Sequence, residues 1–302
     1  MKETSFFAQA QLLIRCLPSI AEESCFAMKG GTAINMFIRP MPRLSVDVDL
    51  TYIPIEDRET SLRNISAALE RIAIKIQKTI PNSKVQKSQR NGQIIKLVVS
   101  VSNAAVKIEP NEVFRGATYA PKKMDLVKEA EDLFEMSAQI PIVPIADLYG
   151  GKICAALDRQ HPRDLFDIKI LLENEGVTEE IRKGFIVFLC SHDRPMHELL
   201  SANFKDLKAQ YTREFVEMTK DEVPLEDLYA ARKDLLSTIL KTVSNDEKQF
   251  LLSLKMGQPK WDLLGVQGVE FLPGIQWKLQ NILRMSPERR KAQIAKLEAV
   301  LS

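Results

Sequence analysis

The six residues Ser45 to Leu50 constrain the fold more than any other part of the chain, because polar and apolar side chains alternate along them. An alternation with a period of two predicts a β-strand that is buried on one face. The polar residues Ser45, Asp47 and Asp49 then share the other face. Two neighbouring carboxylates repel each other unless a cation lies between them, and oxygen ligands suit Mg²⁺. The alternative is a solvated strand edge with no ligand.

A glycine turn, Lys29-Gly30-Gly31-Thr32, comes before this strand and opens into a short apolar helix. Small residues at such a turn let backbone N–H groups approach a phosphate, with the positive end of a helix behind them. A Gly-Gly pair by itself is most often only a turn. Combined with the two carboxylates, it predicts a phosphate-plus-metal site that transfers a nucleotidyl group.

The order of these features resembles the local pattern of the nucleotidyltransferase superfamily. The string Lys29-Gly-Gly-Thr followed by Arg43-Leu-Ser-Val-Asp-Val-Asp-Leu resembles a narrower group, the AbiEii/MenT-like nucleotidyltransferase toxins of type IV toxin–antitoxin, or abortive-infection, systems. One departure is the Pro-rich segment 37–42, which makes the interval between Gly31 and Asp47 longer than in many superfamily members. This longer interval affects the geometry of the loop between the glycine turn and the strand more than the chemistry of the site.

The composition is that of an ordinary globular protein, and its net charge is small. Its 302 residues suffice for one large or two ordinary domains, and 45% are apolar and 27% charged. The formal net charge is only +2, so a nucleic-acid surface must be a local patch. The cysteines are scattered, which argues against a zinc ribbon or a disulfide framework. No signal peptide or membrane-length apolar run is visible, so we expect a cytoplasmic protein without a membrane partner.

The N-terminal half predicts an α/β arrangement on one mixed sheet. A strand over 24–28, the Asp-x-Asp strand, a helix over 57–79 and a strand meander over 84–109 follow one another. Within the meander, Asn91-Gly92 favours a tight hairpin turn.

Beyond about Leu126 the character changes, and from Pro144 on only helical patterns appear. We expect an N-terminal nucleotidyltransferase-type α/β domain over residues 1–125 and an all-helical domain over 126–302, with the site in a cleft between them. The expected helices after Leu126 cover residues 128–136, 145–159, 163–174, 178–190, 208–223, 225–241, 246–255, 274–284 and 287–301.

Lys107 and Glu109 alternate with apolar residues and therefore share one strand face. In isolation they would be an exposed edge pair. The family resemblance implies that this strand carries a third acidic group, Glu109, and that Lys107 is the basic residue of the second motif. Asp47, Asp49 and Glu109 would then hold two divalent ions, Mg²⁺ or Mn²⁺, roughly 3.5–4 Å apart.

The stretch 147–168 is the second informative region. On a helix, Lys152 and Arg159 lie on one stripe with the small Ala156 between them. Pro162 ends that helix and is suited to begin the next one.

Arg163 and Asp164 then lie in the first turn of the second helix. Lys152 can grip a triphosphate as a point charge, with Arg159 or Arg163 as a planar fork. The alternative is an ordinary salt-bridged helix start built from Arg163, Asp164 and Asp167.

Lys-x-x-Ala-x-x-x-x-Arg followed by Arg-Asp-x-x-Asp resembles the third and fourth motifs of the AbiEii-type family. The resemblance implies that Lys152 binds the nucleotide and that Asp164 assists catalysis, with Asp167 as the competing assignment. The expected catalytic residues are Asp47, Asp49, Glu109 and Asp164. The expected nucleotide ligands are Gly30, Gly31, Thr32, Ser45, Lys107, Lys152, Arg159 and Arg163.

Some residues are set aside. Cys190, His192 and His197 fit no standard zinc spacing, and Cys154 lies on an apolar helix. A charged helix face is usually only solvated, but the C-terminal cations are the best candidates for RNA phosphates. These are Arg284, Arg289, Arg290, Lys291 and Lys296.

The residues predict a metal-dependent nucleotidyltransferase that uses an NTP, with Glu109 or Asp164 accepting the proton of the attacking hydroxyl. The family resemblance implies that the acceptor is the 3′ end of a tRNA, that its extension blocks translation, and that a cognate antitoxin restrains the enzyme. The alternatives are transfer to another RNA, a protein or a small molecule, and a non-catalytic protein that binds NTP or a partner. Base preference, oligomeric state and the mode of neutralisation do not follow from the sequence.

Overall fold

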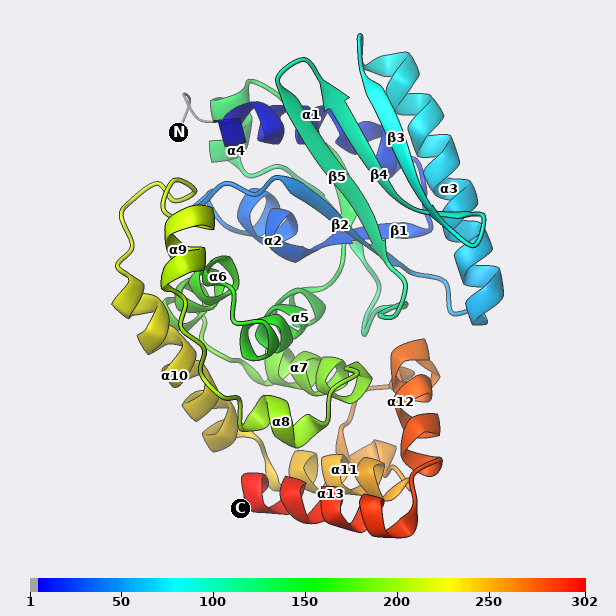
Figure 1. Cartoon of the computed structure of the whole chain (residues 1–302), viewed down its shortest axis with the longest axis vertical. Coiled ribbons are helices and arrows are strands. Elements are labelled where there is room, and N and C mark those ends of the chain that lie inside the picture. The colour runs from blue at the N-terminus through cyan, green and yellow to red at the C-terminus, as the bar shows by residue number, and fades with distance from the viewer. Residues whose placement is uncertain (1–4) are drawn as a thin grey trace. The chain divides into compact units, whose positions relative to one another are not determined.

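The computed structural model describes residues 5–302 (Figure 1). The chain forms two compact units, which are described separately. The first runs to Pro144 and includes the later segment Glu214–Glu222, and the second contains Ile145–Arg213 and Val223–Ser302. Within the described residues, every helix is too short or too polar to cross a membrane.

The first unit is built on one mixed sheet of seven strands. Their order is β3-β4-β5-β2-β1-β7-β6, in which β2 pairs with β5 and β1 with β7 in parallel, and the other neighbours are antiparallel. The strands are β1 (Phe26–Lys29), β2 (Asp47–Tyr52), β3 (Lys84–Arg90), β4 (Gln93–Val101), β5 (Ala104–Asn111), β6 (Lys122–Asp125) and β7 (Gln139–Ile142). The helices of this unit are α1 (Ser5–Ala21), α2 (Gly30–Ala33), a π-helical turn (Ile34–Ile38), α3 (Arg58–Thr79) and α4 (Lys128–Phe134).

Burial alternates along β5 and along Asp47–Leu50 of β2, as the alternation predicts, whereas Phe26, Ala27 and Met28 of β1 are all buried. Val48 and Leu50 of β2 are fully buried, as is Ile108 of β5. Helices α1 and α3 contact each other and pack on the sheet, α1 against β5 and β7 and α3 against β3 and β4. Asp57 begins α3 by accepting a hydrogen bond from the Thr60 N–H at 2.9 Å.

The Pro-rich segment before β2 is held by a segment from far along the chain. The backbone N–H of Leu44 donates to the carbonyl of Met218 at 2.8 Å, and Arg43 and Thr219 form an isolated antiparallel bridge. The Lys220 N–H also donates to the Pro42 carbonyl at 3.3 Å, so the end of the Pro-rich segment and the two residues after it pair with the returning segment Glu214–Glu222. This segment belongs to the first unit although its neighbours in sequence belong to the second.

The predicted α/β class and mixed sheet are confirmed, and so is the hairpin, whose Asn91 and Gly92 both adopt positive φ angles. Two strands were not predicted. β6 is a short charged edge strand and β7 contains Pro141, so neither carries an alternation long enough to identify. Because β7 pairs with β1, the first unit extends to Pro144, past the boundary expected at residue 125.

The second unit contains only helices and connecting loops among its described elements, as expected. The structure adds a short helix, α8, and shortens the pattern over 208–223 to α9. The helices are α5 (Ile145–Asp158), α6 (Pro162–Glu173), α7 (Glu179–Ser191), α8 (Met196–Leu200), α9 (Lys208–Glu214), α10 (Leu225–Thr242), α11 (Asn245–Met256), α12 (Pro273–Leu283) and α13 (Pro287–Leu301), with 3₁₀ turns at Trp261–Leu263 and Val269–Phe271.

Helices α5 and α7 pack with their backbones in direct contact. A Cβ added at Gly184 would lie 2.2 Å from the carbonyl oxygen of Ala146, and one added at Gly150 would lie 2.5 Å from the carbonyl carbon of Gly184. Neither backbone atom can move without shifting a helix. The two glycines therefore set the separation of α5 and α7 and the position of every side chain on α5.

We predict that Gly150→Ala lowers the free energy of unfolding by roughly 1–3 kcal/mol, because an added methyl group overpacks a rigid contact. Gly151→Ala is the matched control, since its Cβ meets only the ring edge of Phe188, at 3.1 Å. That ring can shift, and alanine gains up to about 1 kcal/mol in helix propensity. Chemical denaturation of both variants checks the difference. Equal stability of the two would contradict the backbone contact.

Candidate functional site

A row of charged residues crosses three adjacent strands of the first unit. Lys29 of β1 is the register partner of Asp49 on β2, and Asp49 is the partner of Glu109 on β5. Residues in register on neighbouring strands project to the same face of a sheet, with the strands about 4.8 Å apart. Lys29, Asp49 and Glu109 therefore lie side by side.

A second row lies one pleat away on the same face. Asp47 of β2 is in register with Lys107 of β5. Both aspartates are partly exposed, whereas Lys107 and Glu109 are exposed. Five charged side chains thus lie on the face opposite the apolar core. Lys29 had no predicted role, although its pairing opposite Asp49 could have been anticipated from two antiparallel strands joined by the glycine turn.

The donor set fits a hard divalent cation held partly by substrate. Within residues 5–302, no three His, Cys, Asp or Glu side chains converge on a common point as a ready-made metal cage. Mg²⁺ seldom needs such a cage, because it retains waters and binds through one or two carboxylates plus substrate phosphates. Asp47 and Asp49 supply two such carboxylates on one face of β2.

Gly30 brings the glycine turn against the second of these carboxylates. It has a φ angle of +78°, and a Cβ at this position would lie 2.3 Å from Asp49 Oδ2. Only glycine permits both this backbone conformation and this close approach. The position of the Asp49 carboxylate therefore depends on the conformation of the glycine turn.

The Thr32 side chain forms hydrogen bonds within the protein. It is 1% exposed, and its hydroxyl donates to the carbonyl oxygen of Asp47 at 2.6 Å and lies 2.9 Å from Ser45 Oγ. Ser45 is also buried. The expectation that Thr32 and Ser45 face a phosphate thus needs correction, because these hydroxyls bind each other and fasten α2 to the start of β2.

Arg43 is a buried cation that had no predicted role. It is 2% exposed, its Nη1 donates to the carbonyl of Leu44 at 2.9 Å, and its Nη2 would lie 2.5 Å from a Cβ at Gly31. The guanidinium therefore lies directly behind the glycine turn. Its position follows from the loop pairing with Glu214–Glu222, which no local sequence pattern reveals.

In the second unit, Lys152 lies between two aspartates. Its Nζ is 2.9 Å from Asp164 Oδ1 and 2.9 Å from Asp167 Oδ2. All three side chains are nearly inaccessible, with exposures of 6%, 2% and 1%. Lys152 comes from α5, and the two aspartates lie one turn apart on α6. The ammonium therefore joins the two helices.

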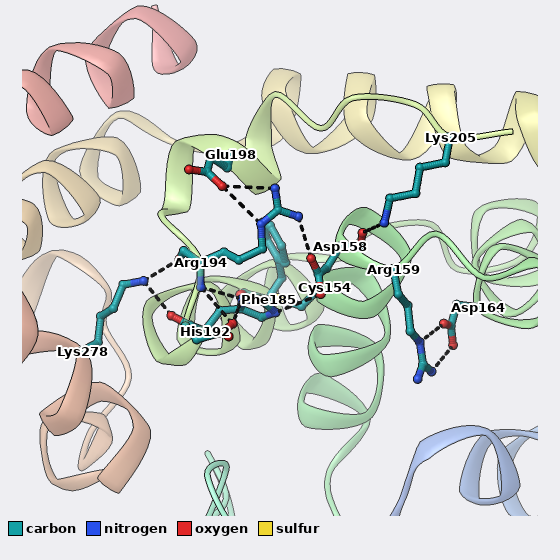
Figure 2. Close-up of polar contacts among 11 residues, drawn as sticks. Cys154, Asp158, Arg159, Asp164, Phe185, His192, Arg194, Glu198, Lys205 and Lys278 are labelled. Atoms are coloured by element: carbon teal, nitrogen blue, oxygen red, sulfur yellow. Dashed lines mark hydrogen bonds and ion pairs between the residues drawn. The ribbon is translucent and has the colours of Figure 1, made fainter.

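We call the cluster of Lys152, Asp164 and Asp167 the Lys152–Asp164 centre. Arg159 binds Asp164 of this centre from the solvent side (Figure 2). Its Nε lies 2.5 Å from Asp164 Oδ2 and its Nη2 3.0 Å from Asp164 Oδ1, and its side chain is 64% exposed. Burial by itself raises the pKa of Asp164, but Lys152 and Arg159 outweigh it and hold this pKa well below its usual range. Asp164 therefore stays ionised at neutral pH and is poorly suited to accept a proton.

The start of α6 supports this arrangement. His161 is its N-cap, accepting a hydrogen bond from the Arg163 N–H at 3.2 Å, and Pro162 is the first helical residue, as predicted. The Arg163 side chain is partly exposed in the first turn. The alternative of a salt-bridged helix start built from Arg163, Asp164 and Asp167 is not what the structure shows. The cations that bind these aspartates, Lys152 and Arg159, come from the preceding helix and the residue directly after it.

A buried hub holds the turn between α5 and α6. Gln160 has a φ angle of +56° and is 2% exposed. Its Oε1 accepts from Arg232 Nη1 at 2.8 Å and from the Lys205 N–H at 3.1 Å, and its Nε2 donates to the Asn203 carbonyl at 2.8 Å. The Arg232 guanidinium lies 4.3 Å from the Phe204 ring centroid. The hub fixes the residue that follows Arg159.

The residues set aside as metal or nucleophile candidates are structural. Cys154 and Cys190 are buried, and burial raises the pKa of the Cys190 thiol to about 12. The His192 carbonyl accepts from Lys278 Nζ at 2.6 Å (Figure 2). His197 is buried, and burial lowers its pKa.

We predict that Asp164→Asn lowers the free energy of unfolding by roughly 3–5 kcal/mol near pH 7, because it leaves buried positive charge uncompensated. The low pKa of Asp164 stabilises the protein above the unfolded-state value of about 3.9. The difference between parent and variant should therefore shrink as the pH falls below about 4. Denaturation measured from pH 7 to pH 2 checks both expectations.

Asp132→Asn is the control for the charge change alone. Asp132 lies 2.8 Å from Lys128 Nζ, but both side chains are exposed, so its loss should change the free energy of unfolding little. A deficit in Asp164→Asn that stayed constant down to pH 2 would refute the assigned ionisation.

Comparison with known proteins agrees with the motif pattern. The model of a family described as "Nucleotidyl transferase AbiEii toxin, Type IV TA system" matches residues 11–281. No curated protein sequence matches the chain. Among solved structures, the chain is similar to MenT4, a nucleotidyltransferase toxin from Mycobacterium tuberculosis H37Rv. The TM-score is 0.61 at 12% identity, over 99% of this chain and 94% of that chain, and at this identity the likeness shows the fold.

Proposed function

The chain belongs to the AbiEii family of nucleotidyltransferase toxins of type IV toxin–antitoxin systems, and we propose that it transfers a nucleotide from an NTP to an RNA acceptor in a reaction that depends on Mg²⁺ or Mn²⁺. The observation that carries this proposal is the register of β1, β2 and β5. It sets Asp47, Asp49 and Glu109 on one face, with the glycine turn against Asp49.

Asp47 and Asp49 are the proposed ligands of the divalent ion, and Glu109 borders them. A bound divalent ion supplies charge neutralisation at the α-phosphate as pyrophosphate leaves. The Gly30-Gly31 turn is proposed to offer backbone N–H groups to the phosphates, because these two residues carry no side chains of their own. Thr32, Ser45 and Arg43 hold this turn in place from behind.

The nucleotide grip of the second unit is proposed to be Arg159 and Arg163, rather than Lys152 itself. Lys152 is enclosed by two carboxylates, whereas the Arg159 side chain is largely exposed. Asp164 holds the Arg159 guanidinium through Nε and Nη2, and the exposed edge of this guanidinium is proposed to meet a phosphate. Lys152, Asp164 and Asp167 then act as a scaffold that orients Arg159. Lys107, exposed on β5, is a further proposed phosphate ligand.

Glu109 is the better candidate for the proton acceptor. It is exposed next to Asp49 in register, whereas Asp164 is buried between two cations that keep its pKa low. A general base must reach the hydroxyl that it deprotonates and must be able to hold the proton. Glu109 is exposed and therefore accessible to a substrate hydroxyl, whereas Asp164 is buried and held ionised.

The acceptor is proposed to be RNA, with a tRNA 3′ end as the specific expectation from the family. Extension of that end would block translation, and a cognate antitoxin would counteract it. We also propose a cytoplasmic location, because NTPs and tRNA are found there. Support for an RNA acceptor comes from the positive charge of α12 and α13. The rival proposal is a protein or small-molecule acceptor. Incubation with labelled NTP distinguishes the two, because the label enters either the RNA or the protein and small-molecule fractions.

We predict that Asp49→Asn abolishes nucleotide transfer and leaves the melting temperature within a few degrees of the parent. The change removes a carboxylate from the partly exposed strand face and no core packing. Transfer of α-labelled NTP to total RNA with Mg²⁺ measures the effect. Asp125→Asn is the control, because Asp125 is an exposed strand aspartate that binds only Gln139 among the described residues. Parental transfer by a well-folded Asp49→Asn protein would remove the metal assignment.

Glu109→Gln should lower kcat by about 10²–10⁴-fold, the usual contribution of a general base, while the affinity for NTP changes little. The amide keeps the shape of the side chain but cannot accept the proton. Single-turnover transfer and equilibrium NTP binding separate the two quantities. A variant with parental kcat, or one that loses NTP affinity instead, would assign Glu109 to nucleotide binding or to the strand surface.

A further inference from the structure

Helices α12 and α13 present a surface that the catalytic residues do not use. In Figure 1, α12 runs down the view and is followed by α13, which runs across its lower edge alongside α11. We define the aromatic-basic surface as a set of exposed and partly exposed side chains of this region. Its members are Phe271, Gln276, Trp277, Gln280, Arg284, Arg289, Arg290, Lys291 and Lys296.

The positive charge of this surface is not neutralised. Within residues 5–302, Arg284, Arg289, Lys291 and Lys296 form no ion pair, and the Arg290 guanidinium donates only to the backbone carbonyl of Met256. Some exposed lysines elsewhere do pair, for example Lys75 with Glu22 and Lys128 with Asp132, and others, such as Lys122 and Lys123 of β6, do not pair within the described part of the chain.

Carboxylates are also scarce in this part of the sequence. Between Phe271 and Leu297, the only one belongs to Glu288. With a net charge of only +2 over the whole chain, this is a local accumulation of positive charge. Such a patch attracts a polyanion.

Aromatic and amide side chains accompany the cations. Trp277 is 44% exposed and Phe271 63% exposed. Trp277, Gln280 and Arg284 lie at positions i, i+3 and i+7 along α12 and its C-cap, and therefore share one helix face. Flat aromatic rings stack on unpaired bases, amides can bind base edges, and arginines bind phosphates.

The surface is held firmly from behind. Lys278, next to Trp277 but on the buried side of α12, donates to the carbonyls of His192 and Arg194 at 2.6 Å each (Figure 2). Arg194 in turn donates to Asp158 Oδ1 at 2.7 Å, at the end of α5. The residue after Asp158 is Arg159. These contacts fix α12 relative to the Lys152–Asp164 centre.

We propose that the aromatic-basic surface binds a single-stranded segment of the RNA acceptor, with a base stacked on Trp277 and phosphates on the arginines. This inference rests on the proposed function. The exposed apolar side chains of this region, which also include Leu283 at 52% and Met256 at 46%, would by themselves suit a protein partner as well. The unpaired cations, with a single carboxylate between Phe271 and Leu297, instead favour a flexible polyanion with flat bases.

The test is binding of a fluorescently labelled, unstructured RNA oligonucleotide to the full-length protein, measured by anisotropy at several salt concentrations. Trp277→Ala should weaken binding by about 10–100-fold, the range for loss of one stacked base. Trp277→Phe should recover most of the affinity, because it keeps an aromatic face. Arg284→Glu with Arg289→Glu should reduce the salt slope by about 0.7 for each phosphate that the variant no longer binds.

Matched controls lie outside the surface. Tyr119→Ala removes an aromatic side chain of similar exposure, 45%, from the first unit, and Lys122→Glu with Lys123→Glu reverses two exposed lysines of β6. None of these should change RNA affinity. Circular dichroism melting confirms that each variant is folded.

The outcomes separate this inference from the proposed function. If the parent transfers nucleotide to RNA, and Trp277→Ala binds RNA and modifies it as the parent does, the surface assignment is overturned and the proposed function stands. If Trp277→Ala alters only self-association or protein binding, the surface is a protein interface and the inference is again overturned. Absence of any RNA transfer by the parent would overturn both.

Discussion

The register of β2 with its two neighbours is the constraint on which the candidate site depends. Side chains alternate faces along a strand, so a slip of one residue would move Asp47 and Asp49 into the core and Val48 to the surface. The complete burial of Val48 and Leu50 opposes such a slip. The apolar core of the first unit therefore determines where the charged face lies, and packing and chemistry are fixed by the same pairing.

A second buried interaction organises the second unit. The Lys152 ammonium joins α5 to α6 through Asp164 and Asp167, while Gly150 and Gly184 set α5 against α7. A buried ion pair of this kind adds little net stability, but it tolerates few alternative arrangements, since breaking it is costly. Its main effect here is to hold Asp164 ionised and Arg159 in a fixed orientation at the surface.

Much of this arrangement could be predicted from local sequence. The Asp-x-Asp alternation, the Asn91-Gly92 turn and the helix start at Pro162 each depend on neighbouring residues only, and all three are confirmed. The burial of Thr32 and Lys152 was not predicted, because it depends on partners brought together by folding. Arg43 and Arg232 were missed for the same reason. Their loop and hub contacts join segments far apart in the chain.

The most direct test of the central claim follows the two ends of the triphosphate. Purified protein, Mg²⁺ and total RNA are incubated with each NTP labelled either at the α-phosphate or at the γ-phosphate. Nucleotidyl transfer predicts that α-label enters RNA and that γ-label leaves as pyrophosphate, with both lost when the divalent ion is chelated. Label from the γ-position in the acceptor, or α-label in protein with none in RNA, would contradict the account.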